Sequence, residues 1–491
     1  MIVHAKSLCL ALVLLLTVGF SSAAFAVTYY VDYVSGLDSN VGTSKSTPWK
    51  RHPDMKGWSG GSTYTHTAGD RFIFRGGVTW PASALPLNVS AGGAASSPDY
   101  YGVDTTWYVG GTFSRPIFDA QGTTTNGIVN IANASNITID NFEMRDVVFT
   151  DNQGAGLITI EYVPKNILIK NSYLHKWTLA SGIATDDAHG GVIVNTGNVP
   201  PVGIVVDSTT ISNQEYAATK NNGVAVRNVQ TVSNSEIHDV PTAILFVGDV
   251  HGNHIYRINY PTGDFDPTYH TNLIYMAAQS FNPPRNFIYN NHIHDVGSGT
   301  GIYIEPCFYS SFGSATISVY NNVVYNSYMG GGGIILVDPE SGSGACGQVY
   351  IYQNTLQQPD GSQIGMVRSL QNHSGTNRIA TLVTRNNFYI GPNGEWDLSF
   401  AASPSSISNI QVSNAAATTA GYSSANLFRP LSETSLTVNR AIAISCPDCP
   451  GIDKDRLGIV RGQGGAWDVG AYEYGSTTSG AIVPPKNLRV N

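Results

Sequence analysis

Two acidic residues and a histidine gather in one short segment of this sequence, residues 263–272. The segment reads G-D-F-D-P-T-Y-H-T-N and brings Asp264, Asp266 and His270 directly before an apolar run at 273–276. Further along, Glu305 follows a second apolar run. Two carboxylates and an imidazole on one wall are suited to general acid/base catalysis. Asp264 and Asp266 also offer the oxygen ligands that Ca²⁺ prefers, so Ca²⁺ is the one cofactor that the sequence suggests.

A second polar cluster, D-D-A-H-G-G, precedes the apolar residues at 192–194 and contains Asp186, Asp187 and His189. If the intervening strands stack, His189 and His270 lie roughly 14 Å apart and cannot act on the same bond. We therefore expect the second cluster to bind substrate. Lys220 and Arg227 fall between the two clusters, where a cation can neutralise a substrate carboxylate.

Both clusters also have a purely structural interpretation. Asp and His before a strand often cap turns, and a Ca²⁺ ion in an Asp-rich loop often serves only rigidity. The acidic residues at other strand ends, Glu161, Asp338 and Glu340, are interpreted as solvated groups.

The elements that must position these residues repeat along the chain. Between residues 139 and 388 one phrase recurs nine times, as in I-Y-N-N-H-I at 288–293, V-Y-N-N-V-V at 319–324 and I-Y-Q-N-T-L at 351–356. The phrases are short, rich in β-branched residues and bounded by turn formers, which is typical of strands. Short apolar runs such as 224–226, 273–276 and 302–304 supply a second strand family. A period of roughly 30 residues predicts a β-solenoid whose coils stack on their neighbours.

This geometry predicts which side chains point outward. If Ile302 and Ile304 face the core, Tyr303 and Glu305 face out, and Tyr303 can bind substrate. The recurring asparagines are interpreted as turn residues with left-handed backbone. We expect the residues that follow each phrase to form a ladder of rings in which Asp239 and Asp295 hold two histidines; these residues are His175, His238, Tyr256, His294 and Tyr325.

The first 26 residues resemble a secretory signal peptide. Lys6 precedes an apolar run at 8–20, and the segment ends in Ala24-Phe25-Ala26. The run is too short for a membrane span, and no other segment is long enough. We therefore expect a secreted protein, extracellular or periplasmic. The predicted organisation is a signal peptide at 1–26, an N-terminal cap and first coils at 27–135, a solenoid core at 136–400, C-terminal coils and a closing module at 401–475, and a flexible tail at 476–491.

Composition narrows the choice of partners. Only 12% of the residues are charged and 52 are glycine, which suits tight turns in an extracellular β protein. The 26 tyrosines suggest exposed aromatic surface, and the net charge of -8 argues against nucleic acid as a partner. We expect the protein to be a monomer.

Four cysteines follow the predicted signal peptide, and export favours disulfides. Cys307 and Cys346 flank successive coils and can bridge them. Cys446 and Cys449 suit a small disulfide loop better than half of a zinc site, because no second C-x-x-C accompanies them.

Several stretches together resemble secreted bacterial right-handed parallel β-helix proteins of the pectate-lyase-like superfamily. They are Y-Y-V-D at 29–32 with the loop and Pro-Trp at 36–49, A-G-D-R-F-I-F-R-G-G-V-T-W at 68–80, L-F-R-P-L at 427–431 and W-D-V-G-A-Y-E-Y at 467–474. The resemblance implies an all-β right-handed parallel β-helix of about ten coils with a C-terminal capping module. Residues 455–458, D-R-L-G, depart from the turn usual before the closing phrase.

The resemblance implies an enzyme that acts on polysaccharide in a groove along the helix. We expect a lyase or epimerase acting on a uronate-containing glycan, with His270 as base and Lys220, Arg227 or Ca²⁺ neutralising the carboxylate. The alternatives are a glycoside hydrolase with Asp266 and Glu305 as its carboxylate pair, or a non-enzymatic glycan-binding or adhesive surface protein.

Overall fold

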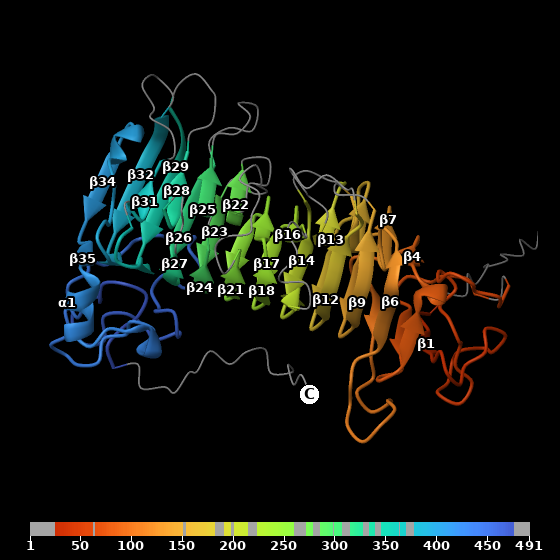
Figure 1. The fold of residues 1–491 in the computed structure, drawn as a ribbon. Helices are drawn as coiled ribbons and strands as arrows, with labels where there is room; N and C mark the ends of the chain where they lie inside the picture. Colours follow the sequence, from red (N-terminus) through yellow and green to blue (C-terminus); the bar gives the residue numbers. More distant parts are fainter. Residues whose placement is uncertain are drawn as a thin grey trace, which may run out of the picture.

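The computed structural model describes residues 25–61, 64–150, 154–181, 191–197, 201–214, 223–259, 272–277, 285–297, 299–306, 315–327, 333–338, 345–362, 364–369 and 378–475. In that part of the chain nearly all regular structure is β, arranged as a rod of stacked coils (Figure 1). No helix among the described residues has the length and apolar character to cross a membrane.

Three parallel sheets run the length of the rod, each built from one strand of successive coils. The 13-stranded sheet contains, in spatial order, β1 (Thr28–Val31), β2 (Arg71–Phe74), β5 (Asp99–Gly102), β8 (Ile137–Asp140), β11 (Ile167–Lys170), β14 (Ile204–Asp207), β17 (Thr231–Ser233), β20 (Asp249–His251), β23 (Arg285–Tyr289), β26 (Thr316–Tyr320), β29 (Ala345–Tyr352), β32 (Arg378–Arg385) and β34 (Pro404–Ile407).

The 12-stranded sheet continues each coil after a turn. It contains β3 (Thr79–Pro81), β6 (Ile117–Thr124), β9 (Glu143–Phe149), β12 (Tyr173–Leu179), β15 (Thr210–Ser212), β18 (Glu236–Val240), β21 (His254–Ile258), β24 (His292–Val296), β27 (Val323–Ser327), β30 (Thr355–Gln357), β33 (Phe388–Ile390) and β35 (Ile410–Val412).

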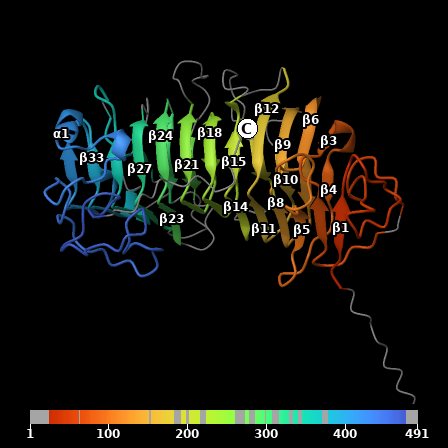
Figure 2. The same cartoon turned by 90° about the horizontal axis from the view of Figure 1, so that it is seen from below.

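The 10-stranded sheet closes the coil. It contains β4 (Leu87–Val89), β7 (Val129–Ala132), β10 (Gly156–Glu161), β13 (Gly191–Asn195), β16 (Val224–Arg227), β19 (Thr242–Leu245), β22 (Asn272–Ala277), β25 (Thr300–Glu305), β28 (Ile335–Val337) and β31 (Val367–Arg368). Figures 1 and 2 show it on the opposite side of the rod from the 12-stranded sheet. The predicted right-handed parallel β-helix is confirmed, and each repeated phrase proves to span a turn and to supply strands to two sheets.

Aligned apolar columns make the core. In the 13-stranded sheet one inward column is aligned residue for residue and is buried along its length: Ile139, Ile169, Val206, Val232, Val250, Ile288, Val319 and Ile351. β-Branched side chains suit such columns because they pack closely on the pleated surface. Since side chains alternate across a strand, the intervening residues point outward and are free for chemistry.

A ladder of buried asparagines fixes the turn between the 13- and 12-stranded sheets. Asn291, Asn322 and Asn354 each donate Nδ2 to the next asparagine's Oδ1 at 2.9–3.0 Å, and Asn253 and Asn387 extend the ladder. Each Nδ2 also donates to a backbone carbonyl of the preceding coil, as Asn322 does to Ile288 at 2.9 Å. The residue before each of Asn291, Asn322, Asn354 and Asn387 takes positive φ, between 54° and 57°. The structural interpretation of the asparagines is therefore confirmed.

The C-terminal segment folds back along the side of the last coils (Figure 1). The helix α1 (Asn414–Thr419) begins where the Ser413 side chain accepts from the amide of Ala416. Tyr422, Phe428 and Tyr472 pack on outward residues of the 12-stranded sheet, whereas Ile444 and Ile452 pack on those of the 13-stranded sheet. The closing module thus covers the corner between two sheets.

One of the two predicted disulfides is confirmed, and the other stays a prediction. Cys446 and Cys449 form a disulfide, which confirms the small loop. Cys346 is disulfide-bonded, but Cys307 lies outside the described residues, so that pairing stays a prediction.

The ladder should carry a large share of the stability of the central coils. Replacing Asn322 by Ala removes the acceptor for the backbone amide and Nδ2 of Asn291, and we expect the free energy of unfolding to fall by about 2 kcal/mol or more. Urea unfolding followed by circular dichroism measures this. Asn88→Ala, at an exposed position, is the control, and equal effects of the two substitutions would contradict the role of the ladder.

Candidate functional site

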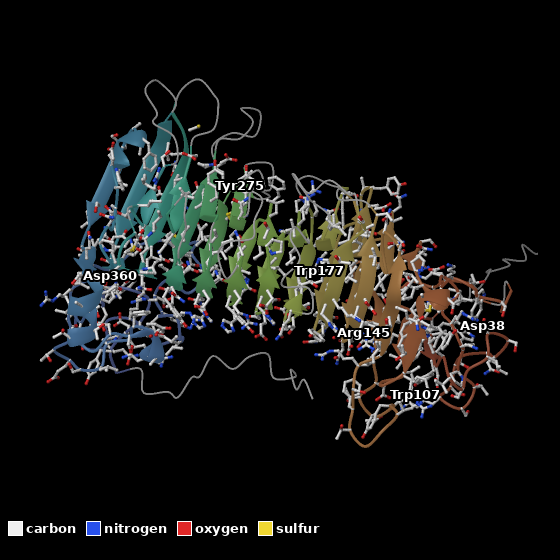
Figure 3. The ribbon with its side chains drawn as sticks, in the orientation of Figure 1. Asp38, Trp107, Arg145, Trp177, Tyr275 and Asp360 are labelled. Carbon is white, nitrogen blue, oxygen red and sulfur yellow. A yellow bond between two sulfur atoms is a disulfide. The ribbon has the colours of Figure 1, made fainter. Side chains whose placement is uncertain are left out.

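One outward column crosses the 10-stranded sheet and mixes arginine with tyrosine. Read across adjacent strands, it consists of Arg227, Leu245, Tyr275, Tyr303, Leu336 and Arg368. Tyr275 and Tyr303 stack with their ring centroids 5.0 Å apart and their planes 14° apart. Figure 3 shows Tyr275 on this side of the rod and Arg145 of β9 on the other. The column provides a straight aromatic floor between two cations.

Glu305 lies beside the two tyrosines and is held by both. Tyr303 donates its hydroxyl to Oε1 at 2.7 Å, and Tyr275 donates to Oε2. The side chain points outward, as expected, while Ile302 and Ile304 face the core. Glu305 is nevertheless only 3% exposed. A buried carboxyl group beneath half-buried phenols is typical of a site that tunes protonation.

Burial raises the pKa of Glu305, and the nearby charge of Asp338 raises it further against the lowering effect of the two hydroxyls. Burial, and then the hydrogen bond and charge of Glu305, also raise the pKa of Tyr303. The carboxyl group is therefore a stronger base than a solvated glutamate, and the phenol keeps its proton. Together they form a base and a proton donor on one wall.

Asp338 was interpreted as a solvated group, and that interpretation is wrong. Asp338 is fully buried at the end of β28, and its Oδ1 accepts a hydrogen bond from the Ser369 hydroxyl. Coil stacking places it next to Glu305, because Ile304 pairs with Val337.

Tyr275 was not predicted as a site residue. Its position in the run L-I-Y-M at 273–276, aligned with I-Y-I at 302–304, indicates that it lies beside Tyr303.

Arg227 lies on the outward face of the 10-stranded sheet, away from the two tyrosines. Val226 lies in the core and Arg227 points outward, half-buried, with its pKa lowered by burial. Two strand steps separate it from Tyr275, about 10 Å. The remaining predicted site residues lie outside the described residues and stay predictions: Asp186, Asp187, His189, Lys220, Asp264, Asp266 and His270.

The ring ladder forms on the 12-stranded sheet. His238 stacks on Tyr256 at 4.6 Å, Tyr256 on His294 at 5.2 Å and His294 on Tyr325 at 5.1 Å. As expected, Asp239 holds His238 at 2.6 Å and Asp295 holds His294 at 2.8 Å. Ser212 stands between His175 and His238 in the register, so His175 is separated from the ladder.

A second column, missed in the sequence, lies beside the ladder. Glu236, His254 and His292 are directly aligned on adjacent strands, and the rings of His254 and His292 stack at 4.7 Å. Burial, and then nearby positive charge, lowers the pKa of His254 to about 3 and that of His292 to about 2. The signal was the residue before the last apolar residue of each phrase, which is Glu, His and His in three successive phrases.

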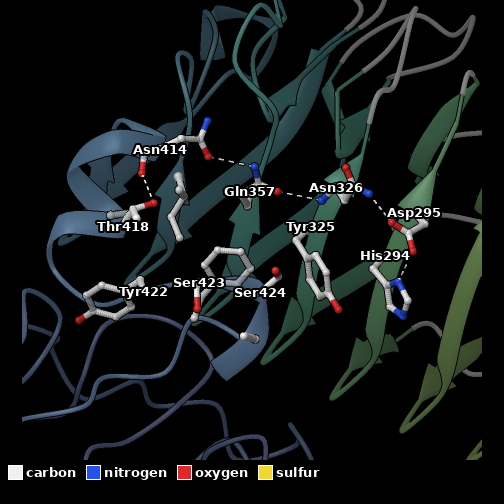
Figure 4. A pocket seen from close by; sticks show the side chains of 14 residues that line it. His294, Asp295, Tyr325, Asn326, Gln357, Asn414, Thr418, Tyr422, Ser423 and Ser424 are labelled. Atoms are coloured by element: carbon white, nitrogen blue, oxygen red, sulfur yellow. Dashed lines mark hydrogen bonds and ion pairs between the residues drawn. The ribbon is translucent and has the colours of Figure 1, made fainter.

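A polar cavity of about 620 Å³ lies between part of this sheet and the closing module. Hydrogen bonds link its wall from Asn414 through Gln357 and Asn326 to Asp295 and His294 (Figure 4). Tyr325, Tyr422 and Phe428 add aromatic surface. The cavity lies on a different sheet from Glu305, so the two places are separate.

No family model and no curated protein matches the sequence. Solved structures similar to the chain include pectate lyase Pel9A (TM-score 0.38, 11% identity, 92% of this chain and 97% of that chain), a GH136 lacto-N-biosidase from Eubacterium ramulus (0.36, 11%, 78% and 67%) and PfbA, a surface adhesin of Streptococcus pneumoniae (0.39, 12%, 71% and 79%). At these TM-scores they carry no argument about function, and the β-helix fold rests on the sheets of the chain itself.

The raised pKa of Glu305 makes stability depend on pH. Because the folded state binds this proton more tightly than the unfolded state, the contribution is fully present below the unfolded pKa of about 4.3 and is lost as pH rises through the folded pKa. We therefore expect wild type to lose stability relative to Glu305→Gln as pH rises above about 4. Chemical unfolding at several pH values measures the difference.

Glu161→Gln, at a partly exposed strand end of the same sheet, is the matched control. A constant difference between wild type and Glu305→Gln across that pH range would contradict the assigned environment of Glu305.

Proposed function

We propose that the protein is a secreted polysaccharide lyase that acts on a uronate-containing glycan along the 10-stranded sheet. The observation that carries the proposal is the buried Glu305 carboxyl group held by the hydroxyls of Tyr275 and Tyr303, between two arginines in one straight column. An extended sugar chain suits a floor that repeats with every coil.

In the proposed reaction Glu305 removes the proton from C5 of the uronate. The electron pair of that C–H bond forms the C4–C5 double bond, the C4–O bond breaks, and Tyr303 gives its proton to the departing oxygen. The raised pKa of Glu305 favours the first step, and because the charge of Glu305 raises the pKa of Tyr303, protonation of Glu305 makes the phenol a stronger acid for the second. Base and donor lie on one wall, which favours elimination over epimerisation, since epimerisation needs a proton donor on the opposite face.

The arginines serve neighbouring sugars. Arg227 is two strand steps from Tyr275, and Arg368 is two steps from Tyr303, about 10 Å in each case. At that distance neither contacts the sugar at the tyrosines, but each can pair with a carboxylate further along the chain. Lys220, or a Ca²⁺ ion held by Asp264 and Asp266, remains a candidate for neutralising the reacting carboxylate, and His270, predicted as the base, remains an alternative to Glu305 in that role.

A glycoside hydrolase is the second candidate, and the nearness of Asp338 to Glu305 favours it. Hydrolysis needs two carboxyl groups, one protonated and one ionised, and a raised pKa on one of a close pair is the usual arrangement. New reducing ends without an unsaturated product would identify this reaction. Binding without any product would instead indicate a non-enzymatic glycan-binding or adhesive protein.

Catalysis should depend on the carboxyl group and the phenol separately. We expect Glu305→Gln and Tyr303→Phe each to lower kcat by about 10²–10⁴ fold, because each removes one proton-transfer group. Ultraviolet absorbance of unsaturated uronate and mass spectrometry of products, over pectate, alginate, glycosaminoglycans and neutral polysaccharides with and without chelator, measure this. Tyr289→Phe, in a stacked tyrosine pair on the 13-stranded sheet, is the control. Full activity in both site variants would reject the site.

The arginines should affect substrate binding rather than the chemical step. We expect Arg227→Met and Arg368→Met to raise KM for long uronate chains and to leave kcat near wild type, because each removes a charge from a neighbouring position. Salt should raise the wild-type KM and have less effect on the variants. An unchanged KM in both variants would remove the arginines from the glycan path.

A further inference from the structure

Three histidines converge on the outer face of the 12-stranded sheet, away from the proposed glycan path. His254 lies on β21, and His292 and His294 lie on β24 next to it. One ring nitrogen of each lies within 4.8 Å of the other two. The Nε2 atoms of His254 and His294 are 2.9 Å apart. The arrangement is partly buried, with side-chain exposures of 27% for His254 and 17% for His294.

Acidic residues lie behind two of these rings, and one of them, Asp295, holds a ring nitrogen. Asp295 Oδ2 is 2.8 Å from His294 Nδ1, as Figure 4 shows, and Glu236 Oε1 is 3.9 Å from His254 Nδ1. The Asp295 carboxylate favours an N–H at His294 Nδ1, so His294 Nε2 presents its lone pair to His254 Nε2. A proton on His254 Nε2, or a cation in its place, then occupies the 2.9 Å between the two nitrogens.

His292 supplies an independent observation. It is 5% exposed, its Nε2 lies 3.2 Å from the Tyr325 hydroxyl, and its Nδ1 is buried with no hydrogen-bond partner among the described residues. A buried imidazole nitrogen without a partner carries a desolvation cost. A metal ion at this position would satisfy it.

We propose that His254, His292 and His294 bind one divalent transition-metal ion, and that Zn²⁺ is the ion whose chemistry fits best. Neutral imidazoles are zinc ligands, whereas Ca²⁺ and Mg²⁺ require oxygen. Tetrahedral zinc with Zn–N bonds of about 2.0–2.1 Å separates its ligand nitrogens by roughly 3.3 Å, so binding requires the rings of His254 and His292 to rotate out of their stacked arrangement. The Asp295 carboxylate behind His294 matches the carboxylate–histidine–metal pattern that orients ligands.

The residues around the three histidines leave room for a fourth ligand and influence the affinity for a metal ion. His294 also lines the polar cavity beneath the closing module, which leaves room for a water molecule. Arg456 of that module lies near enough to lower the pKa values of His254 and His292, and its charge opposes a cation. Replacing it therefore changes affinity in the direction opposite to removing a ligand.

Titration calorimetry of the chelator-treated full chain with ZnCl₂, together with the visible spectrum after Co²⁺ addition, tests the site. Wild type should bind one equivalent and give the intense bands of tetrahedral Co²⁺. His292→Ala should lose saturable binding, and Asp295→Asn should weaken it by about 10–100 fold. Arg456→Gln should tighten it several-fold.

His251→Ala is the matched control, because His251 is a stacked ring on the 13-stranded sheet. It should bind Zn²⁺ as wild type does, and circular dichroism verifies the fold of each variant. The proposal is overturned if wild type shows no one-equivalent binding, or if Asp295→Asn and His292→Ala bind as tightly as wild type. Glycan turnover is not part of this readout, so this result does not depend on the proposed function.

Discussion

The register between successive coils is the constraint on which the rest of the structure depends. Parallel pairing at one strand spacing aligns residues that lie roughly thirty positions apart, and a slip of one residue would turn every outward side chain into the core. Apolar columns such as Ile288, Val319 and Ile351 resist that slip, and the asparagine ladder locks the turn beside them. Every cluster of functional groups on the rod is a consequence of this alignment.

The alignment separates the chemistry by face. The 10-stranded sheet gathers a carboxyl group, two phenols and two arginines, whereas the 12-stranded sheet gathers histidines, tyrosines and acids beneath the closing module. In a solenoid each coil contacts mainly its neighbours, so a change on one face has little effect on the other. The closing module covers the corner between two sheets, and together with the 12-stranded sheet it lines a polar cavity.

Much of the fold could be predicted from the sequence, because equivalent positions of successive repeats align when the coils stack. The phrases predicted the stacked coils, the outward direction of Tyr303 and the rings held by Asp239 and Asp295. Tyr275 and Asp338 were not predicted as partners of Glu305, since their contact depends on pairing between strands of different coils. The contact between His254 and His294 was not predicted either, since it runs diagonally between two neighbouring strands rather than between paired residues. The burial of Asp338 depends on neighbouring coils and has no local signal.

A double-mutant cycle on the free energy of unfolding tests the coil register most directly. Tyr275→Phe and Glu305→Gln change residues on successive coils that contact only if β22 pairs with β25 as described. The register predicts a coupling of about 1 kcal/mol or more between the two substitutions, because Tyr275→Phe removes the hydroxyl donor and Glu305→Gln removes the charge of its acceptor. Effects that add to within about 0.3–0.5 kcal/mol would contradict the alignment and the sites built on it.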